Sequence, residues 1–542
     1  MNRDYTVRVS FLFLLFCAAY SLILLNLYFI QIKHRDFYLQ RAQQQHTVTL
    51  KKTPPRALIT DRTDQLIALN KNSLAAFVLP KKIHDRDALQ TFLEQHFPTA
   101  AERLKITTDQ HFMFVKRRLT PEQVALIEQE NLADLYMIEE PNRYYPIESL
   151  GQILGITDID NNGLFGLEQI YNEQLAGTPT TYSIQKDARS GYFYFKKETQ
   201  VAGYSGSPIK ITIDANLQFL SHEALKETVD TFQAQEGSIL IMDPETGHIL
   251  TMAHYPNFDP NNIEKIVQEQ TKIKPIAEVY ELGSVMKVFV ALAALEEGVV
   301  TAEEEINCRN VKSTTINGMP VNTWKEHGTI PFCEVIQYSN NIGIALIAQR
   351  LGTKLYDYYK LCGFSKKTGL HLPAEQSGTI THPKKWSKQS LISLSFGYEV
   401  SATLLQLATA FCTVANGGYL VEPKIIFDQK PQAKEPIFSF ETIMTMQDIL
   451  EKTVTQGTAR RAALKGYRVM GKTGTANLII DGKYNPDHNI YTFAGIVQKD
   501  EYKRVIVTFV KEAKKKNLYA SQVAVPLFER IMEHVLIHDK VL

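Results

Sequence analysis

An excess of charge of either sign is missing from this sequence. Across 542 residues, 59 lysines and arginines stand against 58 aspartates and glutamates, a formal net charge of +1. A nucleic-acid-binding protein needs a basic excess, so no nucleic-acid partner is expected. Hydrophobic residues make up 44% of the chain and charged residues 22%, ordinary globular values that exclude a wholly disordered chain. At roughly 150 residues per domain, the length allows about three units.

Cysteine is also scarce. The chain has 5 cysteines and no Cys-x-x-Cys pair, so neither a zinc ribbon nor a disulfide framework is predicted. No His-Glu-x-x-His sequence is present either, and we expect no metal and no other cofactor. Four cysteines are scattered through the second half of the chain, where we expect them to be small buried hydrophobic side chains: Cys308, Cys333, Cys362 and Cys412.

Long hydrophobic runs are absent with one exception. Residues 9–32 contain no charged side chain, and about 20 apolar residues suffice to cross a bilayer as a helix. A buried core helix is the alternative, but core helices seldom lack charge for so long. No small-residue cleavage site follows, as it would in a signal peptide. The sequence therefore predicts a single transmembrane anchor at 9–32, after a short tail at 1–8.

The charges beside this anchor do not decide its orientation. Arg3 and Arg8 precede it, whereas Lys33, Arg35 and Arg41 follow it. The positive-inside rule needs an asymmetry between the two flanks, and these counts give no clear one. In either orientation, the residues from 33 onward lie on one side of the membrane.

The region after the anchor carries no obvious chemistry. Residues 33–52 are charged and rich in glutamine, which favours a helix that ends before Pro54 and Pro55. Beyond these prolines, strand-like runs mix with helical stretches such as 86–96. A turn-rich seam near residue 205 then marks a domain boundary.

Two domains are therefore expected after the anchor, at 33–205 and 206–542. In the second, strands at both ends enclose a set of helices, which is an α+β layout. The predicted strands are 209–214, 237–242, 249–253, 492–497 and 504–510. The predicted helices are 217–232, 284–297, 342–351 and 523–536.

A serine and a lysine open the helix predicted at 284–297. Ser284 and Lys287 are three residues apart, so they lie on one face of a helix. A serine hydroxyl is a poor nucleophile until a neighbouring base takes its proton. A lysine in an apolar setting has a lowered pKa and can be that base. Two further Ser-x-x-Lys matches, at 183–186 and 207–210, open no apolar helix.

Two companion motifs make this pair more specific. A Ser-Asn-Asn sequence at 339–341 precedes the predicted helix at 342–351. A Lys-Thr-Gly-Thr sequence at 472–475 follows a strand-like run further downstream. A second Lys-Thr-Gly copy, at 367–369, lies in a loop-like context soon after the Ser-Asn-Asn motif, and we discard it.

Together the three motifs resemble those of the penicillin-binding proteins and related lactamases. The wider sequence is similar to class B penicillin-binding proteins, the membrane-anchored peptidoglycan D,D-transpeptidases. Six stretches carry this wider resemblance: 56–62, 143–146, 166–168, 259–261, 397–398 and 403–408. The chain departs from the family pattern at Ala57, where glycine is usual, at Thr63-Asp64, where Asn-Gly is usual, and at Leu282, where proline is usual.

The resemblance implies an α+β fold with distinct parts. An elongated, mixed α/β pedestal of the dimerisation type at 33–205 precedes the transpeptidase domain at 206–542. That domain has a five-stranded antiparallel sheet with helices on both faces, beside an all-helical subdomain. The protein would be a single-pass protein of the inner (cytoplasmic) membrane with its catalytic domain on the periplasmic side.

The resemblance also implies roles for the motif residues. Ser284 attacks the carbonyl between the two terminal D-alanines of a peptidoglycan stem peptide, and Lys287 accepts the proton of the Ser284 hydroxyl. Ser339 passes a proton to the leaving D-alanine, Asn341 orients Lys287 and the substrate, and Lys472 lowers the pKa of Lys287.

On the substrate side, the strand residues Thr473, Gly474 and Thr475 would bind the substrate carboxylate. β-Lactam antibiotics would acylate Ser284. A glycosyltransferase of the FtsW type and other divisome proteins are the expected partners. Asn341 favours the division (FtsI) type of the family, because elongation-type members tend to carry aspartate there.

Other interpretations stay open. An elongation-type transpeptidase is the nearest, and a non-catalytic divisome scaffold is the most distant. A class A β-lactamase would need a deacylating glutamate in the sequence Glu-x-x-Leu-Asn. Glu375 lies in the corresponding region, but Gly-Thr stands where Leu-Asn would be required. A β-lactam sensor-transducer would carry several membrane spans. His327 is expected to serve structure rather than acid–base chemistry.

Overall fold

The computed structural model describes residues 3–106, 109–110, 112–186, 193–427, 435–515 and 517–542. The chain forms two compact units, each built from two separate stretches of sequence. One unit comprises Met1–Arg56 and Ala176–Gly206, and the other comprises Ala57–Leu175 and Ser207–Leu542. The domain boundaries expected at 33 and 206 stay a prediction.

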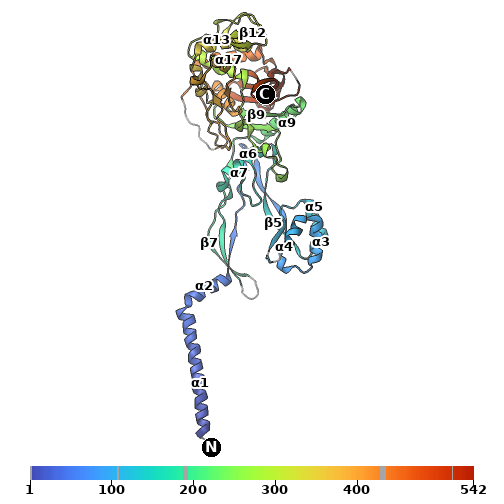
Figure 1. Ribbon diagram of the computed structural model, residues 1–542, viewed down its shortest axis with the longest axis vertical. Coiled ribbons are helices and arrows are strands. Elements are labelled where there is room, and N and C mark those ends of the chain that lie inside the picture. The colour runs from blue at the N-terminus through green and yellow to red at the C-terminus, as the bar shows by residue number, and fades with distance from the viewer. Residues whose placement is uncertain (1–2, 107–108, 111, 187–192, 428–434, 516) are drawn as a thin grey trace. The chain divides into compact units, whose positions relative to one another are not determined.

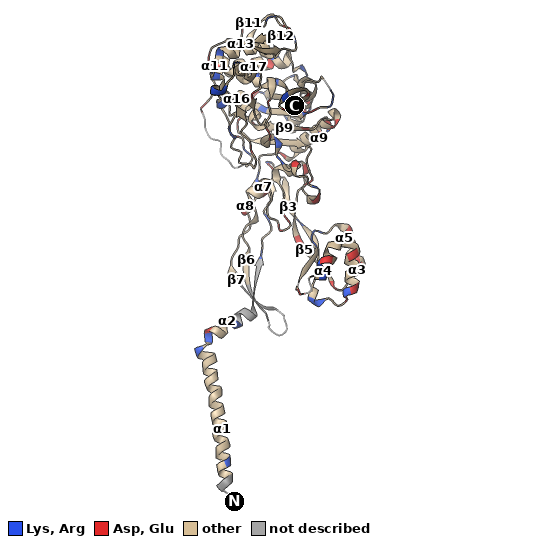
Figure 2. Cartoon of the chain, viewed as in Figure 1, with Lys and Arg blue, Asp and Glu red and all other residues tan. Residues whose placement is uncertain are grey.

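The smaller unit begins with the helix α1 (Arg3–Tyr28), which a π-helical turn (Phe29–Lys33) extends. Among the described residues, this is the only helix long and apolar enough to cross a membrane, and none of it is buried. In Figure 2, α1 beyond its first turns has no segment coloured as a charged residue up to its end at Tyr28. The helix thus contains the anchor expected at 9–32.

The prediction of a helix throughout 33–52 is wrong in its last six residues. Helix α2 (Arg35–His46) ends early, and Thr47–Lys52 forms the strand β1. β1 pairs antiparallel with β6 (Thr180–Lys186), which pairs in turn with β7 (Phe193–Val201). Pairing with a segment so distant in the sequence overrides the local helical preference of the chain.

The larger unit opens with a sheet of short and long strands. Its order is β4-β3-β2-β8, and β5 also pairs with β3. The strands are β2 (Ile59–Thr60), β3 (Leu66–Val78), β4 (Met113–Lys116), β5 (Leu135–Tyr144) and β8 (Ile209–Lys210). The helices of this region are α3 (Arg86–His96), α4 (Pro98–Ile106), α5 (Pro121–Glu130), α6 (Gly151–Leu154), α7 (Gly166–Ile170) and α8 (Asn172–Ala176).

Two sequence predictions can be checked in this region. The helix predicted at 86–96 has these bounds, and Asp85 caps it by accepting a hydrogen bond from the Ala88 N–H at 3.0 Å. The strand predicted at 209–214 is shorter than expected, because only Ile209 and Lys210 form a ladder with β2.

The rest of the larger unit is built on an antiparallel five-stranded sheet of order β10-β9-β19-β18-β17, in agreement with the expected fold (Figure 1). The two outer pairs come from the two ends of the domain. The strands are β9 (Glu236–Met242), β10 (Ile249–Tyr255), β17 (Arg468–Ile480), β18 (Lys483–Lys499) and β19 (Tyr502–Lys511). β17 forms one edge of the sheet, so one side of its backbone faces away from the ladder.

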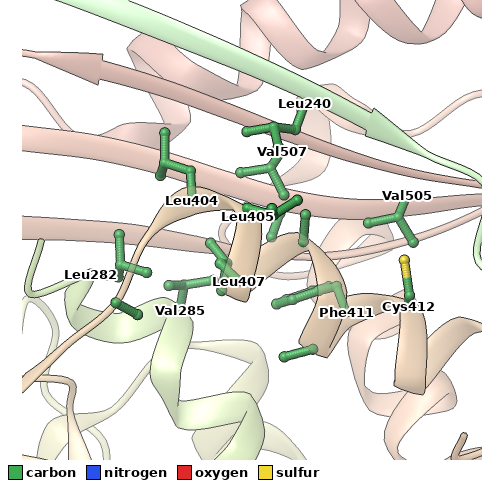
Figure 3. Close-up of a cluster of buried hydrophobic side chains, with 14 of the residues drawn as sticks. Leu240, Leu282, Val285, Leu404, Leu405, Leu407, Phe411, Cys412, Val505 and Val507 are labelled. Atoms are coloured by element: carbon green, nitrogen blue, oxygen red, sulfur yellow. The ribbon is translucent and has the colours of Figure 1, made fainter. Parts of the chain in front are cut away.

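Helices cover both faces of this sheet. Side chains alternate between the faces of a strand. Ile239, Ile241 and Ile506 belong to one hydrophobic cluster with helices α9 (Ala215–Phe232) and α18 (Ala520–His538). Their neighbours on the opposite face belong to a second cluster with helix α16 (Leu404–Ala415), which is buried along its whole length. Figure 3 shows Leu405 of α16 facing Val507 and Leu240 of the sheet.

A largely helical region adjoins the second face. It contains α11 (Lys287–Glu296), α12 (Phe332–Gln337), α13 (Asn341–Leu351), α14 (Lys354–Leu361), α15 (Ser390–Ser395) and α17 (Phe440–Thr455), with the short α10 (Lys274–Ala277) nearby. Small two-stranded sheets accompany these helices: β11 (Glu305–Asn307) with β14 (Thr329–Pro331), β12 (Ser313–Ile316) with β13 (Met319–Asn322), and β15 (Thr379–Ile380) with β16 (Val400–Ser401).

The cysteines are all free thiols, and the four outside the anchor are buried, as predicted. Burial raises the pKa of the Cys308 thiol to about 11 and raises the pKa of Cys362 further. These side chains act as small apolar core residues.

Candidate active site

Ser284 lies in a tight turn rather than in an α-helix. The sequence predicted one helix over 284–297, but Gly283–Met286 forms a 3₁₀ turn and α11 begins only at Lys287. The cause is close packing against β17: Gly283 has φ +62°, and a Cβ on it would lie 2.8 Å from the Thr475 carbonyl oxygen. The other end agrees with the prediction, since Gly298 closes α11 in a left-handed conformation.

Lys287 is fully buried beside the Ser-x-Asn motif. Its Nζ donates hydrogen bonds to the Ser339 carbonyl oxygen at 2.7 Å, to Ser339 Oγ at 3.1 Å and to Asn341 Oδ1 at 2.5 Å. A charged ammonium would donate to all three of these oxygens, whereas a neutral amine would donate to two of them and keep a lone pair. The structure thus brings together the first two motifs that the sequence singled out.

The loop between α12 and α13 holds Ser339 in an unusual conformation. Ser339 has φ +56°, a left-handed geometry that is rare for a residue with a side chain. Asn340 fixes the loop from behind, because its Oδ1 accepts the Gly343 N–H at 2.9 Å and caps α13. Asn341 is oriented by a hydrogen bond from its Nδ2 to the Asn322 carbonyl at 2.6 Å.

Lys472 reaches the same serine from the edge strand β17. It is fully buried, and its Nζ donates to Ser339 Oγ at 2.9 Å and to the Thr473 carbonyl at 3.2 Å. The Ser339 hydroxyl therefore accepts from two lysines at once, which occupies both of its lone pairs. The proton of the Ser339 hydroxyl is therefore free to be donated elsewhere. Ser339 also lines the cleft described below.

The two buried amines have strongly altered acidity. Burial lowers the pKa of Lys287 well below its ordinary value, and the nearby Lys472 lowers it further. Burial alone lowers the pKa of Lys472 to about 7. A Lys287 amine that is neutral near pH 7 can accept a proton, which an ordinary lysine cannot do.

The three residues after Lys472 connect β17 to its surroundings. A Cβ on Gly474 would lie 2.5 Å from the Leu282 carbonyl, so only glycine lets β17 approach the turn that carries Ser284. The Thr473 hydroxyl lies 3.1 Å from that of Thr458, and the Thr475 hydroxyl accepts the Ala520 N–H at 3.0 Å.

These residues surround a cleft of about 610 Å³. All eight predicted site residues belong to the three motifs that meet here, and five of them line the cleft: Ser284, Ser339, Asn341, Thr473 and Thr475. Lys287 and Lys472 lie buried behind Ser339. The eighth predicted residue, Gly474, lies between the flanking threonines of β17.

Sequence reasoning missed several residues of the cleft wall. Asn322, Thr458, Trp324 and Tyr519 also line the cleft. Trp324 is 53% exposed and donates from Nε1 to the Tyr338 carbonyl at 2.6 Å. No local pattern distinguishes these residues, since they belong to segments that only the folded chain brings to the motifs.

Two residues considered for chemistry serve other purposes. His327 is buried, its ring stacks on Tyr338 at 5.1 Å, and its Nδ1 lies 3.2 Å from Asn340 Nδ2. Burial lowers the pKa of His327. Glu375, the only candidate for a deacylating glutamate, accepts the N–H and the hydroxyl of Thr368, in the discarded Lys-Thr-Gly copy.

Comparison with known proteins identifies the family. Residues 237–533, more than half of the chain, match the penicillin binding protein transpeptidase domain. The chain belongs to the penicillin-binding proteins. Residues 51–211 match the penicillin-binding protein dimerisation domain, which agrees with the expected pedestal.

Two curated relatives of this penicillin-binding protein span nearly its whole length. The peptidoglycan D,D-transpeptidase FtsI of Escherichia coli K12 is 27% identical over 99% of this chain and 93% of its own. The stage V sporulation protein D of Bacillus subtilis is 28% identical over 98% of this chain and 86% of its own.

Solved structures share the fold. Penicillin binding protein 3 of Mycobacterium tuberculosis, determined in complex with ampicillin, has a TM-score of 0.69 and 24% identity, and the match covers 91% of this chain and 97% of that one. A peptidoglycan synthetase from Bifidobacterium adolescentis has a TM-score of 0.70 at 19% identity, with coverage of 91% and 97%.

Proposed function

We propose that this penicillin-binding protein is a serine-type peptidoglycan D,D-transpeptidase that cross-links the septal cell wall and is a target of β-lactams. One observation carries the proposal: two buried lysines, Lys287 and Lys472, donate to the hydroxyl of Ser339 in the cleft that Ser284 lines. This arrangement supplies a neutral base, a proton donor and a positive charge beside one nucleophile.

The first step is acylation of Ser284. Ser284 Oγ attacks the carbonyl between the two terminal D-alanines, and the neutral Lys287 amine takes the hydroxyl proton. The backbone N–H groups of Ser284 and Thr475 stabilise the oxyanion. The contact of Gly474 with Leu282 supports this role, since it holds β17 against the turn that carries Ser284.

Departure of the terminal D-alanine completes acylation. The C–N bond breaks, the leaving amine takes the proton of the Ser339 hydroxyl, and the protonated Lys287 passes the Ser284 proton to Ser339 Oγ along their hydrogen bond. Ser339 is then a hydroxyl again and Lys287 is neutral again. Lys472 and the hydroxyls of Thr473 and Thr475 attract the substrate carboxylate. Asn341 keeps the Lys287 amine in position.

The second step transfers the acyl group. An amine from a neighbouring stem peptide attacks the Ser284 ester, an amide bond forms, and Ser284 leaves with its proton restored. A β-lactam acylates the same oxygen, but its ring-opened product stays attached because no glutamate is among the described residues that line the cleft, where it could activate water. Glu375 instead binds the Thr368 backbone and hydroxyl.

The division role rests on Asn341 and on the FtsI name of relatives that span the chain. An elongation-type transpeptidase is the second candidate.

We also propose the cellular arrangement: a tail at 1–8, an anchor at 9–32 in the inner membrane, a pedestal at 33–205, and a transpeptidase domain at 206–542 on the periplasmic side. An FtsW-type glycosyltransferase and other divisome proteins would be its partners.

Acylation by a fluorescent penicillin tests the proposal. The full-length chain in detergent should retain the label slowly, and the Ser284→Ala variant should take up none. Ser207→Ala is the matched control, because Ser207 opens another Ser-x-x-Lys sequence but lies outside the cleft, and it should label like the wild type. Rapid loss of label would indicate a lactamase, and absence of label on the folded wild-type chain would contradict the proposal.

The cellular role has its own test. A fluorescent fusion expressed in the native host should concentrate at division sites, whereas an even lateral distribution would favour the elongation type. A Ser284→Ala chain that still supported septation would favour a non-catalytic scaffold.

A further inference from the structure

A second cavity, of about 400 Å³, lies apart from the catalytic cleft. Its walls are the segment Pro146–Ser149, the side chain of Gln65, and one side of helix α9 from Ala215 to Glu223. It shares no lining residue with the cleft of Ser284. All of its residues belong to the larger compact unit.

The walls of this cavity are fixed by hydrogen bonds. The carboxylate of Asp61 accepts the Gln65 N–H at 2.9 Å and the Ala215 N–H at 3.0 Å, which ties the Gln65 wall to the start of α9. On the other side, Gln218 Nε2 donates to the Ser149 carbonyl at 2.9 Å. The cavity is therefore preformed, as most small-molecule sites are.

Two polar atoms at this cavity have no partner within the described ranges. They are His222 Nε2 and Ser149 Oγ. Both side chains are buried, with exposed fractions of 6% for His222 and 7% for Ser149. A buried polar group without a hydrogen bond costs about 1–3 kcal/mol, and native structures seldom leave such groups unpaired. Both atoms are shielded from the cavity as the side chains stand, so a ligand hydroxyl, which donates and accepts, would pair with either one only after that side chain turns toward it.

The rim of the cavity combines an apolar ring with neutral and acidic polar groups. Phe219 is 53% exposed on α9. Around it are the amides of Gln65 and Asn216 and the carboxylates of Glu148 and Glu223. These side chains offer donors and acceptors in mixed order, and no lysine or arginine lines the cavity. A phosphate or carboxylate ligand is thus disfavoured.

The described residues also include no group of three His, Cys, Asp or Glu side chains that could hold a metal ion. A neutral saccharide fits the remaining chemistry. One face of a pyranose ring presents C–H groups that pack on an aromatic ring, while its edge presents hydroxyls to the amides and carboxylates of the rim.

We propose that this cavity binds a neutral saccharide unit of the glycan strand that carries the stem peptides. The choice of ligand rests on the proposed function, because each stem peptide of peptidoglycan is attached to a glycan strand. Binding here would position the strand on the face of the protein formed by α9 and the segment Pro146–Ser149, while a stem peptide enters the cleft.

The test is titration of the full-length chain with N,N′-diacetylchitobiose, a neutral β-1,4-linked disaccharide without a stem peptide. A polyoxyethylene detergent replaces sugar-headed detergents, which would compete. Protein-observed NMR or calorimetry should give a Kd of roughly 0.1–1 mM. Phe219→Ala should weaken binding about tenfold, as expected for the loss of one stacking ring. Phe440→Ala, which removes another exposed phenylalanine near a helix start (71% exposed), should leave it unchanged.

A second variant tests whether the bound ligand is uncharged. Glu148→Gln keeps the shape and an acceptor oxygen, so disaccharide binding should change less than threefold. No binding to the wild type up to about 10 mM, or equal losses in Phe219→Ala and Phe440→Ala, would overturn the proposal. Penicillin acylation measured on the same samples separates the two proposals: wild-type protein that is acylated but binds no disaccharide fails only this one.

Discussion

Lys287 and Lys472 donate hydrogen bonds to the same atom, the hydroxyl oxygen of Ser339, over 3.1 and 2.9 Å. Two ammonium groups in full burial on one oxygen would repel each other strongly. The structure is therefore consistent with no more than one charged amine at neutral pH. Burial and the nearby Lys472 both lower the pKa of Lys287, whereas burial alone lowers the pKa of Lys472, so we expect Lys287 to lose its proton first.

Removing the charge at Lys472 should shift the pH dependence of acylation. Below pH about 7 Lys472 is charged and lowers the pKa of Lys287. In Lys472→Met this effect is lost, so the pKa of Lys287 rises and a higher pH is needed to form the neutral base. When the acylation rate is plotted against pH, the rise on the acid side should move to higher pH. The maximal acylation rate should fall roughly 10²-fold. Lys465→Met, an exposed lysine, should change neither. A rise that stays in place or moves to lower pH would contradict this account.

The same variant should be more stable than the wild type. The folded-state pKa of Lys472 is about 7, below the ordinary 10.5, so between these values the unfolded chain binds a proton that the folded chain does not. Wild-type stability therefore rises with pH across this window, and burial of Lys472 is destabilising at pH 7. Lys472→Met should melt roughly 2–4 °C higher at pH 7, with a smaller advantage near pH 10. Thermal melts at both pH values check this, and a variant less stable at both would show that Lys472 stabilises the fold.

Gly397 should be required for the position of Ser284. It has φ +89°, and a Cβ on it would lie 2.1 Å from the Gly283 carbonyl oxygen. In Gly397→Ala the turn that carries Ser284 must move, so penicillin acylation should fall at least about tenfold. Gly369→Ala is the matched control: its φ is +92°, but nothing lies within 4 Å of the added methyl. It should lose only about 1 kcal/mol of stability and acylate normally. Equal acylation in both variants would argue against this contact.

The pair of Arg143 and Glu168 should stabilise the region before the transpeptidase domain. Arg143 Nε donates to Glu168 Oε1 at 2.7 Å, and the exposed fractions of the two side chains are 1% and 0%. Glu168→Ala leaves a buried guanidinium unpaired, which should cost about 3–5 kcal/mol in the free energy of unfolding. Glu94→Ala, in the exposed pair with Lys105, should cost under about 1 kcal/mol. Denaturant unfolding measures both, and a small effect of Glu168→Ala would mean that water reaches Arg143.

The candidate site could be predicted from the sequence because its chemistry is concentrated in three short motifs. Ser284 and Ser339 each stand just before a recognisable helix and Lys472 stands inside a strand, and the structure brings them together. The walls of the cleft were not predictable in this way. Trp324, Thr458 and Tyr519 reach the cleft only through tertiary packing.

Fold predictions succeeded where periodicity was strong and failed where distant pairing decided the backbone. The β9 and β10 hairpin, with its short turn, has the strands expected of it. Thr47–Lys52 instead becomes a strand through its pairing with Thr180–Gln185, which no local pattern reveals. The turn at Ser284 is tighter than an α-helix because β17 packs against Gly283, a contact between residues far apart in sequence.

The buried thiols have a consequence for how such a protein matures outside the cytoplasm. Cys308, Cys333, Cys362 and Cys412 are inaccessible, and burial keeps them in the protonated form, which does not attack disulfides. Once folded on the periplasmic side that we propose, the chain offers none of these four thiols to oxidants or to disulfide-forming enzymes. The redox state of the surroundings would then matter to them only until the exported chain has folded.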